Sequence, residues 1–366
     1  MRRVAIVGTG LIGGSIGAGL RALEPAVEVV GYDEDASAAR RARALGAVGD
    51  VAPTAARAVE TADVVVLAVP LDRMPDAVAA IQGAARATAV ITDVGSAKGG
   101  IVPQGEAAFG GRFVGGHPMA GSERNGIEAS DGALFRDAAW VLTPTDATDP
   151  DAYRAAAQLA TSLGSHVVAL GADVHDSLVA RLSHLPQLLA SCLVEVAAGT
   201  GDRDALLTLA GGGFRDVTRI AASHPDIWMG ILRGNRDEVL EAIDRLRSSL
   251  ETAAGRIREG RWDELRAWMT SSRAARLELF TRPDHSEDPV ALALLIPDRP
   301  GVLAEVTTEA GRIGANIEDL RIAHSTEGGR GRLELVITGS DAAASLADAL
   351  EALGYHVLRP DINFAT

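Results

Sequence analysis

The stretch Val4-Ala5-Ile6-Val7-Gly8-Thr9-Gly10-Leu11-Ile12-Gly13 decides the fold of the N-terminal part of the chain. A β-branched run enters a GxGxxG pattern, and small residues at helical spacing follow it. In such a pattern Gly8 permits the tight turn, Gly10 lets the backbone approach a pyrophosphate, and Gly13 lets the helix pack closely on the strand. The sequence therefore predicts a dinucleotide site that is formed by Gly8, Gly10, Leu11, Ile12 and Gly13.

An acidic residue stands where such a site needs one. Asp33 ends the second expected strand, 20 residues after Gly13, at the position where a carboxylate binds ribose hydroxyls. A carboxylate there would repel a 2′-phosphate, so we expect NAD rather than NADP as the cofactor. Arg40 and Arg41 are near in sequence and are the residues that could moderate this preference.

Short β-branched runs alternate with alanine-rich helical stretches up to about residue 171, which predicts a parallel sheet covered by helices. We expect strands at Val4–Val7, Val27–Tyr32, Val64–Val69, Val90–Asp93, Trp140–Leu142 and His166–Leu170. Together with the glycine motif, this alternation predicts an α/β Rossmann domain over residues 1–171.

Two further parts follow. Apolar residues recur at helical spacing from Ala172 onward, which predicts an all-helical domain over residues 172–282. The polar, proline-bracketed segment Thr281–Pro289 has the composition of a linker. Residues 288–366 then show strand, helix, strand, strand, helix, strand, and this βαββαβ order predicts an α+β ferredoxin-like domain.

Composition excludes several classes of function. With 35 basic and 49 acidic residues the net charge is −14, which disfavours nucleic acid as a partner. The strongly apolar run Ala62–Leu71 is much shorter than a membrane span, and we expect a cytoplasmic protein. The single cysteine, Cys192, lies in an apolar helical pattern and is interpreted as a small buried hydrophobe.

Two polar loops are the candidates for catalysis. The first follows a strand and has the sequence Thr92-Asp93-Val94-Gly95-Ser96-Ala97-Lys98. The second contains His117, 21 residues beyond Ser96, and has the sequence Gly115-Gly116-His117-Pro118-Met119-Ala120-Gly121-Ser122-Glu123. We expect both at the carboxyl ends of strands, the ligand-binding edge of such a sheet. The ordinary pKa of histidine suits His117 to take a hydroxyl proton near neutral pH. We expect no metal.

Residues 1–282 resemble the prephenate dehydrogenase family. The resemblance rests on the motifs above and on two more, Ser183-His184-Leu185-Pro186 and Gly211-Gly212-Gly213-Phe214-Arg215-Asp216-Val217-Thr218-Arg219-Ile220-Ala221. The resemblance implies a Rossmann domain joined to a helical domain that forms a homodimer. It also implies NAD-dependent oxidative decarboxylation of prephenate to 4-hydroxyphenylpyruvate, a step of tyrosine biosynthesis. In this family His117 would hydrogen-bond the ring hydroxyl with support from Ser96. His184, Glu123 and Trp228 would line the substrate pocket, and Arg219 would bind a substrate carboxylate.

Prephenate has two carboxylates and a secondary ring alcohol, so its site needs a fixed cation, a base and a hydride acceptor. Without the resemblance, a surface ion pair is as good an interpretation of Arg215 or of Arg219 as a role in the site. His175 and His184 are nine residues apart, on opposite sides of a straight helix. We therefore interpret His184 as the pocket histidine and His175 as solvated. Lys98 is interpreted as an exposed loop lysine.

Three alternatives remain open at this stage. Arogenate dehydrogenase runs the same chemistry on an amine in place of the keto group. The β-hydroxyacid dehydrogenases have a similar N-terminal domain but use a lysine in the second domain. This chain has no lysine after Lys98, which strongly disfavours that mechanism. A non-catalytic NAD or amino-acid sensor is the third, against which the pairing of His117 with Arg219 argues.

The C-terminal stretch Ile296-Pro297-Asp298-Arg299-Pro300-Gly301-Val302-Leu303, with Ile313-Gly314-Ala315-Asn316-Ile317, resembles an ACT domain, the regulatory module of amino-acid metabolism. The resemblance implies an effector site at Asp298, Gly301, Val302, Asn316 and Ile317, between paired modules. Helix-start amides can hold a carboxylate, and Asn316 offers both a donor and an acceptor. We therefore expect feedback control by tyrosine or another aromatic amino acid. The alternative is that Gly301 only turns the chain and Asn316 only caps it.

Overall fold

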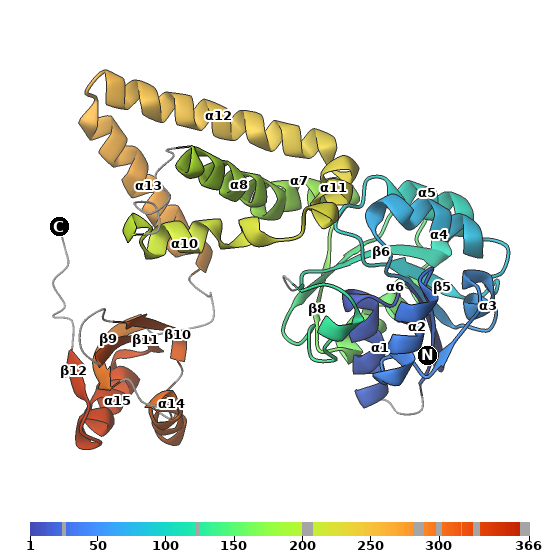
Figure 1. Cartoon of the computed structure of the whole chain (residues 1–366), viewed down its shortest axis with the longest axis horizontal. Coiled ribbons are helices and arrows are strands. Elements are labelled where there is room, and N and C mark those ends of the chain that lie inside the picture. Colours follow the sequence, from blue (N-terminus) through green and yellow to red (C-terminus); the bar gives the residue numbers. More distant parts are fainter. Residues whose placement is uncertain are drawn as a thin grey trace. The chain divides into compact units, whose positions relative to one another are not determined.

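The computed structural model describes residues 1–23, 27–121, 124–199, 208–280, 289–297, 302–315, 317–324 and 330–358. The chain divides into two compact units, Met1–Gly255 and Arg256–Thr366 (Figure 1). The first unit contains every described residue that the sequence predicts for cofactor binding and catalysis.

One eight-stranded sheet organises the first unit. Its strands are β1 (Arg3–Val7), β2 (Glu28–Tyr32), β3 (Asp50–Val51), β4 (Val64–Leu67), β5 (Val90–Asp93), β6 (Phe113–Pro118), β7 (Ala139–Thr143) and β8 (His166–Ala169). The order across the sheet is β3-β2-β1-β4-β5-β6-β7-β8. All neighbouring pairs are parallel except β6 with β7, which is antiparallel. The expected parallel sheet is therefore correct up to β6, and β3 and β6 are strands that the sequence analysis missed.

Both faces of this sheet are covered, because successive side chains of a buried strand point to opposite faces. In β1, Val4 and Ile6 belong to one buried cluster, whereas Ala5 and Val7 belong to another. The covering helices are α1 (Leu11–Leu23), α2 (Ala36–Ala44), α3 (Ala55–Val59), α4 (Met74–Ile81), α5 (Ile101–Phe109) and α6 (Pro150–Ser162), with short turns η1 (Leu71–Arg73), η2 (Gly110–Arg112) and η3 (Ile127–Ala129). Figure 1 shows them packed around the sheet. The fold is a doubly wound, Rossmann-like α/β domain.

The rest of the first unit is helical, as the apolar periodicity predicts. Its elements are α7 (Ala172–Val179), the π-helical turn η4 (Ala180–His184), α8 (Leu185–Ala198), α10 (Gly212–Thr218), η5 (Arg219–Ala222), α11 (Pro225–Gly234) and α12 (Arg236–Arg258), which ends in the second unit. Cys192 is exposed in the single chain. Its interpretation as a buried hydrophobe is therefore wrong, because the described residues of the first unit leave Cys192 on α8 uncovered.

Within the described residues, one continuous helical stretch, Ala172–Ala198, is long and apolar enough by composition alone to cross a membrane. The same stretch buries His175, Asp176 and His184 in polar contacts with the α/β domain and with Asn235 of the loop before α12. Such contacts are typical of a helix that packs in a protein, so we interpret its exposed apolar surface as a protein contact surface.

The second unit begins with the end of α12 and contains α13 (Trp262–Phe280) and a small α+β module. The module consists of β9 (Pro289–Pro297), α14 (Val302–Ile313), β10 (Ile317–His324), β11 (Arg330–Thr338), α15 (Ser340–Ala352) and β12 (His356–Leu358). Its antiparallel sheet has the order β10-β11-β9-β12. The two helices close one core with it, in which Leu294, Val306 and Leu346 are fully buried.

Candidate functional site

The glycine motif forms the turn from β1 into α1 as the sequence predicts. Gly8 has a φ of +98°, and a Cβ atom there would lie 2.4 Å from the carbonyl oxygen of Ala68. A Cβ on Gly13 would lie 1.9 Å from the Gly8 oxygen, whereas the space around Gly10 is open to 4 Å. Leu11 and Ile12 start α1, where backbone N–H groups have no partner within the helix. The turn thus leaves room and donors for a phosphate group.

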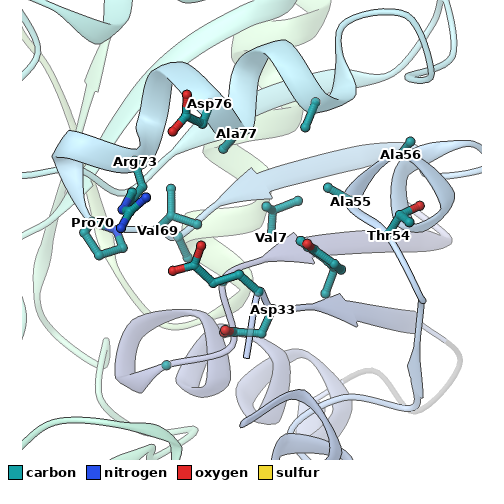
Figure 2. A pocket seen from close by; sticks show the side chains of 16 residues that line it. Val7, Asp33, Thr54, Ala55, Ala56, Val69, Pro70, Arg73, Asp76 and Ala77 are labelled. Carbon is teal, nitrogen blue, oxygen red and sulfur yellow. The ribbon is translucent and has the colours of Figure 1, made fainter. Parts of the chain in front are cut away.

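Asp33 lies at the carboxyl end of β2, beside this turn. Its Oδ2 accepts hydrogen bonds from the backbone N–H of Thr9 at 2.7 Å and from the Thr9 hydroxyl at 3.1 Å. These bonds fix the carboxylate, and each oxygen keeps acceptor capacity for a ribose hydroxyl. Asp33 and Arg73 reach from different sides into a cleft of about 420 Å³, with Val7 and Val69 at its floor (Figure 2). The residues present fit the adenosine and pyrophosphate part of NAD.

We expect kcat/KM with NAD to exceed that with NADP by at least tenfold, because the fixed Asp33 carboxylate would face a 2′-phosphate. Initial rates at saturating substrate, with each cofactor varied, measure the ratio. Replacing Asp33 with serine removes the like charge and should narrow the ratio. Equal kcat/KM values in the unchanged chain would contradict the role of Asp33.

His117 comes from strand β6, not from a loop as its neighbouring glycines suggested. A Cβ on Gly116 would lie 2.6 Å from the Asp93 carbonyl oxygen, and one on Gly115 would lie 2.4 Å from the Thr143 hydroxyl. The glycines are therefore required for close packing of β6 on its neighbours. His117 is the last residue but one of β6. It consequently lies at the same edge of the sheet as the glycine turn, and it is 8% exposed.

The His117 ring contacts a second histidine. Its Nδ1 lies 2.8 Å from Nε2 of His175, and the two rings meet edge to face with centroids 5.1 Å apart. His175 is 1% exposed, and its Nδ1 lies 2.7 Å from Oδ1 of Asp176. The expectation that His175 is solvated is therefore wrong.

His184 is buried as well, because α7 and α8 do not form one straight α-helix. The π-helical turn η4 lies between the two histidines and inserts one extra residue per turn. One extra residue moves the later residues round the axis by about 100°, so the two histidines are about 80° apart instead of opposite. The expectation that only one of the two histidines can face the pocket is therefore wrong.

Lys98 is fully buried, which corrects its interpretation as an exposed loop residue. Its Nζ forms a salt bridge with the equally buried Asp93 and donates to the Gly116 carbonyl oxygen at 2.7 Å. Asp93 also accepts from the backbone N–H groups of Gly95 and Gly116, at 2.8 and 3.0 Å. This cluster ties the loop after β5 to strand β6 and so positions His117.

Burial controls the charge of the site. The pKa of His117 is well below 6.5, first because its ring is desolvated and then because the Lys98 ammonium and two further histidines lie near. Desolvation likewise lowers the pKa of His184 to about 4 and lowers the pKa of Lys98. Both histidines are therefore neutral near pH 7, which is the form in which an imidazole accepts a proton.

The remaining predicted residues are only partly brought together. The ring of His184 lies 6.2 Å from that of Trp228, edge to face, and its Nδ1 lies 3.3 Å from Nδ2 of Asn235. Arg219 is exposed at the start of η5, which packs on α8. Ser96 is half-buried in the loop that carries Lys98. Glu123 lies outside the described residues.

Sequence reasoning missed Asp93, Lys98, His175, Asp176 and Asn235 as members of the site. The Asp93–Lys98 motif could have indicated the first two, because a lone lysine close in sequence to an aspartate is a candidate for a salt bridge. Nothing in the sequence pattern indicated Asn235. Its Nδ2 donates to the Asp176 carbonyl oxygen at 2.8 Å and so joins α7 to the start of α12.

Comparison with known proteins matches the α/β domain and the helical part that follows it, including residues beyond the end of the first unit. Residues 16–169 match the family model described as prephenate dehydrogenase, nucleotide-binding domain, and residues 171–271 match that described as prephenate dehydrogenase, dimerization domain. Among curated relatives, the prephenate dehydrogenase of Bacillus subtilis is 30% identical over 356 residues, 95% of each chain. The cyclohexadienyl dehydrogenase of Zymomonas mobilis is 33% identical over 77% of this chain and 98% of its own.

Two solved structures are similar in fold and sequence. Prephenate dehydrogenase from Aquifex aeolicus, in complex with hydroxyphenyl propionate and NAD⁺, superposes with a TM-score of 0.72 at 31% identity over 76% of this chain and 98% of its own. Arogenate dehydrogenase from Synechocystis gives a TM-score of 0.68 at 28% identity over 76% and 99%. Fold, motifs and these likenesses agree, and the chain belongs to the prephenate dehydrogenase family.

Proposed function

We propose that the chain is an NAD-dependent prephenate dehydrogenase, which converts prephenate to 4-hydroxyphenylpyruvate in tyrosine biosynthesis. The observation that carries the proposal is the buried, neutral His117 at the sheet edge that also carries the NAD turn. A neutral imidazole at that edge can take the proton of a substrate hydroxyl whose carbon faces the nicotinamide. The family membership of the chain supports the same reaction.

Each group at the site has a separate role in this reaction. NAD supplies the hydride acceptor. His117 accepts the hydroxyl proton, with Ser96 beside it in the loop after β5, and the Arg219 guanidinium binds a substrate carboxylate. His184, Trp228 and Glu123 complete the pocket. Loss of carbon dioxide makes the ring aromatic, so the protein needs only to bind, orient and deprotonate the substrate. A residue dedicated to decarboxylation is not required.

The second candidate substrate is arogenate. The likeness to the Synechocystis arogenate dehydrogenase and to the Zymomonas cyclohexadienyl dehydrogenase favours keeping it. NADH formation at 340 nm, with prephenate and arogenate assayed side by side, separates the two. A higher kcat/KM for prephenate supports the proposal, a higher value for arogenate reassigns the substrate, and no turnover of either would indicate a non-catalytic sensor.

Arg219→Ala should raise KM for prephenate by roughly tenfold to 150-fold with a smaller change in kcat. A charge-assisted hydrogen bond to a carboxylate contributes about 1.5–3 kcal/mol, which corresponds to that range. Arg215→Ala, one helical turn earlier, is the matched control and should leave KM near its normal value. If Arg215→Ala raises KM and Arg219→Ala does not, the carboxylate partner is Arg215.

We further propose that residues 172–282 form a homodimer and that the protein works in the cytoplasm. The match of residues 171–271 to a dimerization domain supports the dimer. Exposed apolar side chains on the helices of the first unit, among them Val196 and Leu250, are available for a second copy to cover.

We also propose that residues 1–171 are the Rossmann domain and that residues 288–366 are an ACT-like regulatory domain. The βαββαβ order and the β10-β11-β9-β12 sheet support a ferredoxin-like module. Val302 starts α14 with its side chain in the core, and Ile317 starts β10 packed on the same core. Their contribution to an effector site would come from backbone groups. Asp298, Gly301 and Asn316 lie outside the described residues.

Feedback control is tested on the full chain. Millimolar tyrosine or phenylalanine should lower the rate with prephenate through a coupling of about 1–3 kcal/mol, which is fivefold to 150-fold in affinity. A chain that ends at Arg282 should stay active and lose this response. Absence of any response in the full chain, or an equal response in the shortened one, would rule out regulation by the C-terminal domain.

A further inference from the structure

A line of buried hydrogen bonds starts at His117 and passes through His175 to Asp176. It runs from His117 Nδ1 to His175 Nε2 at 2.8 Å, and from His175 Nδ1 to Asp176 Oδ1 at 2.7 Å. The Asp176 carboxylate also accepts from the backbone N–H of Lys98 at 2.8 Å and from that of Gly99 at 2.7 Å. The residues come from β6, from α7 and from the loop after β5, so three separate segments converge on one line.

The direction of each hydrogen bond follows from Asp176. An ionised carboxylate only accepts, and two backbone N–H groups already donate to this one. Nδ1 of His175 must therefore carry its proton and donate to Asp176. In a neutral imidazole the other nitrogen is then an acceptor, so His175 Nε2 accepts from His117. Nδ1 of His117 must in turn carry the proton, and its Nε2 is left free to act as a base.

We propose that His175 and Asp176 are positioning residues that hold His117 in the Nδ1–H tautomer, with Nε2 turned toward the substrate hydroxyl. The inference deepens the function proposed above and rests on it for the identity of the substrate. His117 remains the group that takes the proton. His175 acts only through His117, and Asp176 acts only through His175.

The charged and titratable groups around His117 are consistent with this arrangement. Burial of the ring disfavours a second proton on His117, and so does the Lys98 ammonium on the loop after β5, which is paired with Asp93. When Nε2 takes the hydroxyl proton, the Nδ1–H bond to His175 persists, and the Asp176 carboxylate at the end of the line supplies a counter-charge through His175. The protonated ring is thus stabilised without losing its orientation.

A purely structural role is the alternative, in which His175 only joins α7 to β6. Two substitutions at this position separate the roles. His175→Gln places an amide oxygen where Nε2 stood, so an acceptor for His117 Nδ1–H is kept. His175→Leu fills similar space and offers no acceptor. The exposed His166 on β8 provides the control His166→Leu.

The first measurement is the tautomer of His117 in the full chain with ¹⁵N-labelled histidine, without substrate. Its ring signals are assigned by their loss in His117→Asn. We expect a proton on Nδ1 and a bare Nε2 in the unchanged chain and in His175→Gln, and a growing Nε2–H population in His175→Leu. A bare Nδ1 in the unchanged chain would overturn the proposal, whether or not the chain oxidises prephenate.

The second measurement is kcat across pH 5–9. His175→Leu should lower kcat by roughly 10²-fold or more at every pH with KM for NAD little changed. The two neutral tautomers of His117 carry the same number of protons, so a change of pH does not convert the wrong one into the right one. His175→Gln should recover most of that loss, and His166→Leu should match the unchanged chain. Equal losses in the leucine and glutamine variants, or a kcat within threefold of normal in His175→Leu, would refute the positioning role. If the unchanged chain does not oxidise prephenate, the proposed function is wrong. The tautomer measurement alone then tests the positioning role of His175.

Discussion

His117→Asn should lower kcat for prephenate by roughly 10²–10⁴-fold, while the affinity for NAD stays near normal. Asparagine keeps a polar side chain of similar size at the end of β6, but it cannot accept the hydroxyl proton. The loss therefore reports the proton transfer. Steady-state rates at saturating prephenate and a fluorescence titration with NAD measure the two quantities. His166→Asn, on an exposed histidine, is the matched control.

The pH profile provides a second test of the same residue. The folded-state pKa of His117 is depressed, so its basic form persists as the pH falls below 6.5 and is lost only at a more acid pH. The acid limb of kcat/KM should accordingly lie below pH 6.5. The free energy of unfolding should change with pH in the same direction. His117 and His184 become protonated in the unfolded chain below about pH 6.5, whereas in the folded protein they stay neutral to a lower pH, about 4 for His184. The folded protein should therefore lose stability as the pH falls below about 6.5. Turnover of His117→Asn within threefold of normal would remove His117 from the mechanism.

Lys98→Met should destabilise the fold by about 3–5 kcal/mol. Methionine fills similar space, but the Asp93 carboxylate, which is fully buried, then has no ionic partner. Removing one member of a buried pair leaves an uncompensated charge, whose cost exceeds the net contribution of the intact pair. Thermal denaturation of the full-length protein measures the loss as a lower melting temperature, and activity should fall with it because Lys98 also holds Gly116 beside His117.

Two further variants show whether the effect comes from the buried charge. Lys98→Met combined with Asp93→Asn should recover part of the lost stability, since neither member of the pair is then charged. Arg154→Met breaks the exposed Arg154–Asp151 pair and should change the melting temperature little. If Lys98→Met melts within about a degree of the unchanged chain, Lys98 and Asp93 do not stabilise the site.

Much of the N-terminal fold could be predicted because its signals are local. The glycine motif, the buried β-branched runs and Asp33 at the end of β2 each specify their structure within a few residues of sequence. Strand β6 was missed for a physical reason. Gly115 and Gly116 have low strand propensity, and the need for them comes from β5 and β7 packed against them.

The polar cluster at the site could not be predicted from periodicity. The π-helical turn that ends at His184 changes the phase of the helix, and the residue pattern of Ala180–His184 does not indicate such a turn. Burial of Lys98 depends on Asp93 and on the Gly116 carbonyl, 18 residues away. His175 becomes part of the site through a partner 58 residues earlier in the chain. These are tertiary contacts, whereas motif spacing reports only local ones.

The stoichiometry of the reaction tests the central claim most directly. Full-length protein with prephenate and NAD should form one NADH, one carbon dioxide and one 4-hydroxyphenylpyruvate per turnover, which absorbance at 340 nm, carbon dioxide release from carboxyl-labelled prephenate and chromatography of the product measure together. NADH without carbon dioxide would show oxidation uncoupled from decarboxylation. Absence of NADH with prephenate would contradict the assignment of the chain as a prephenate dehydrogenase.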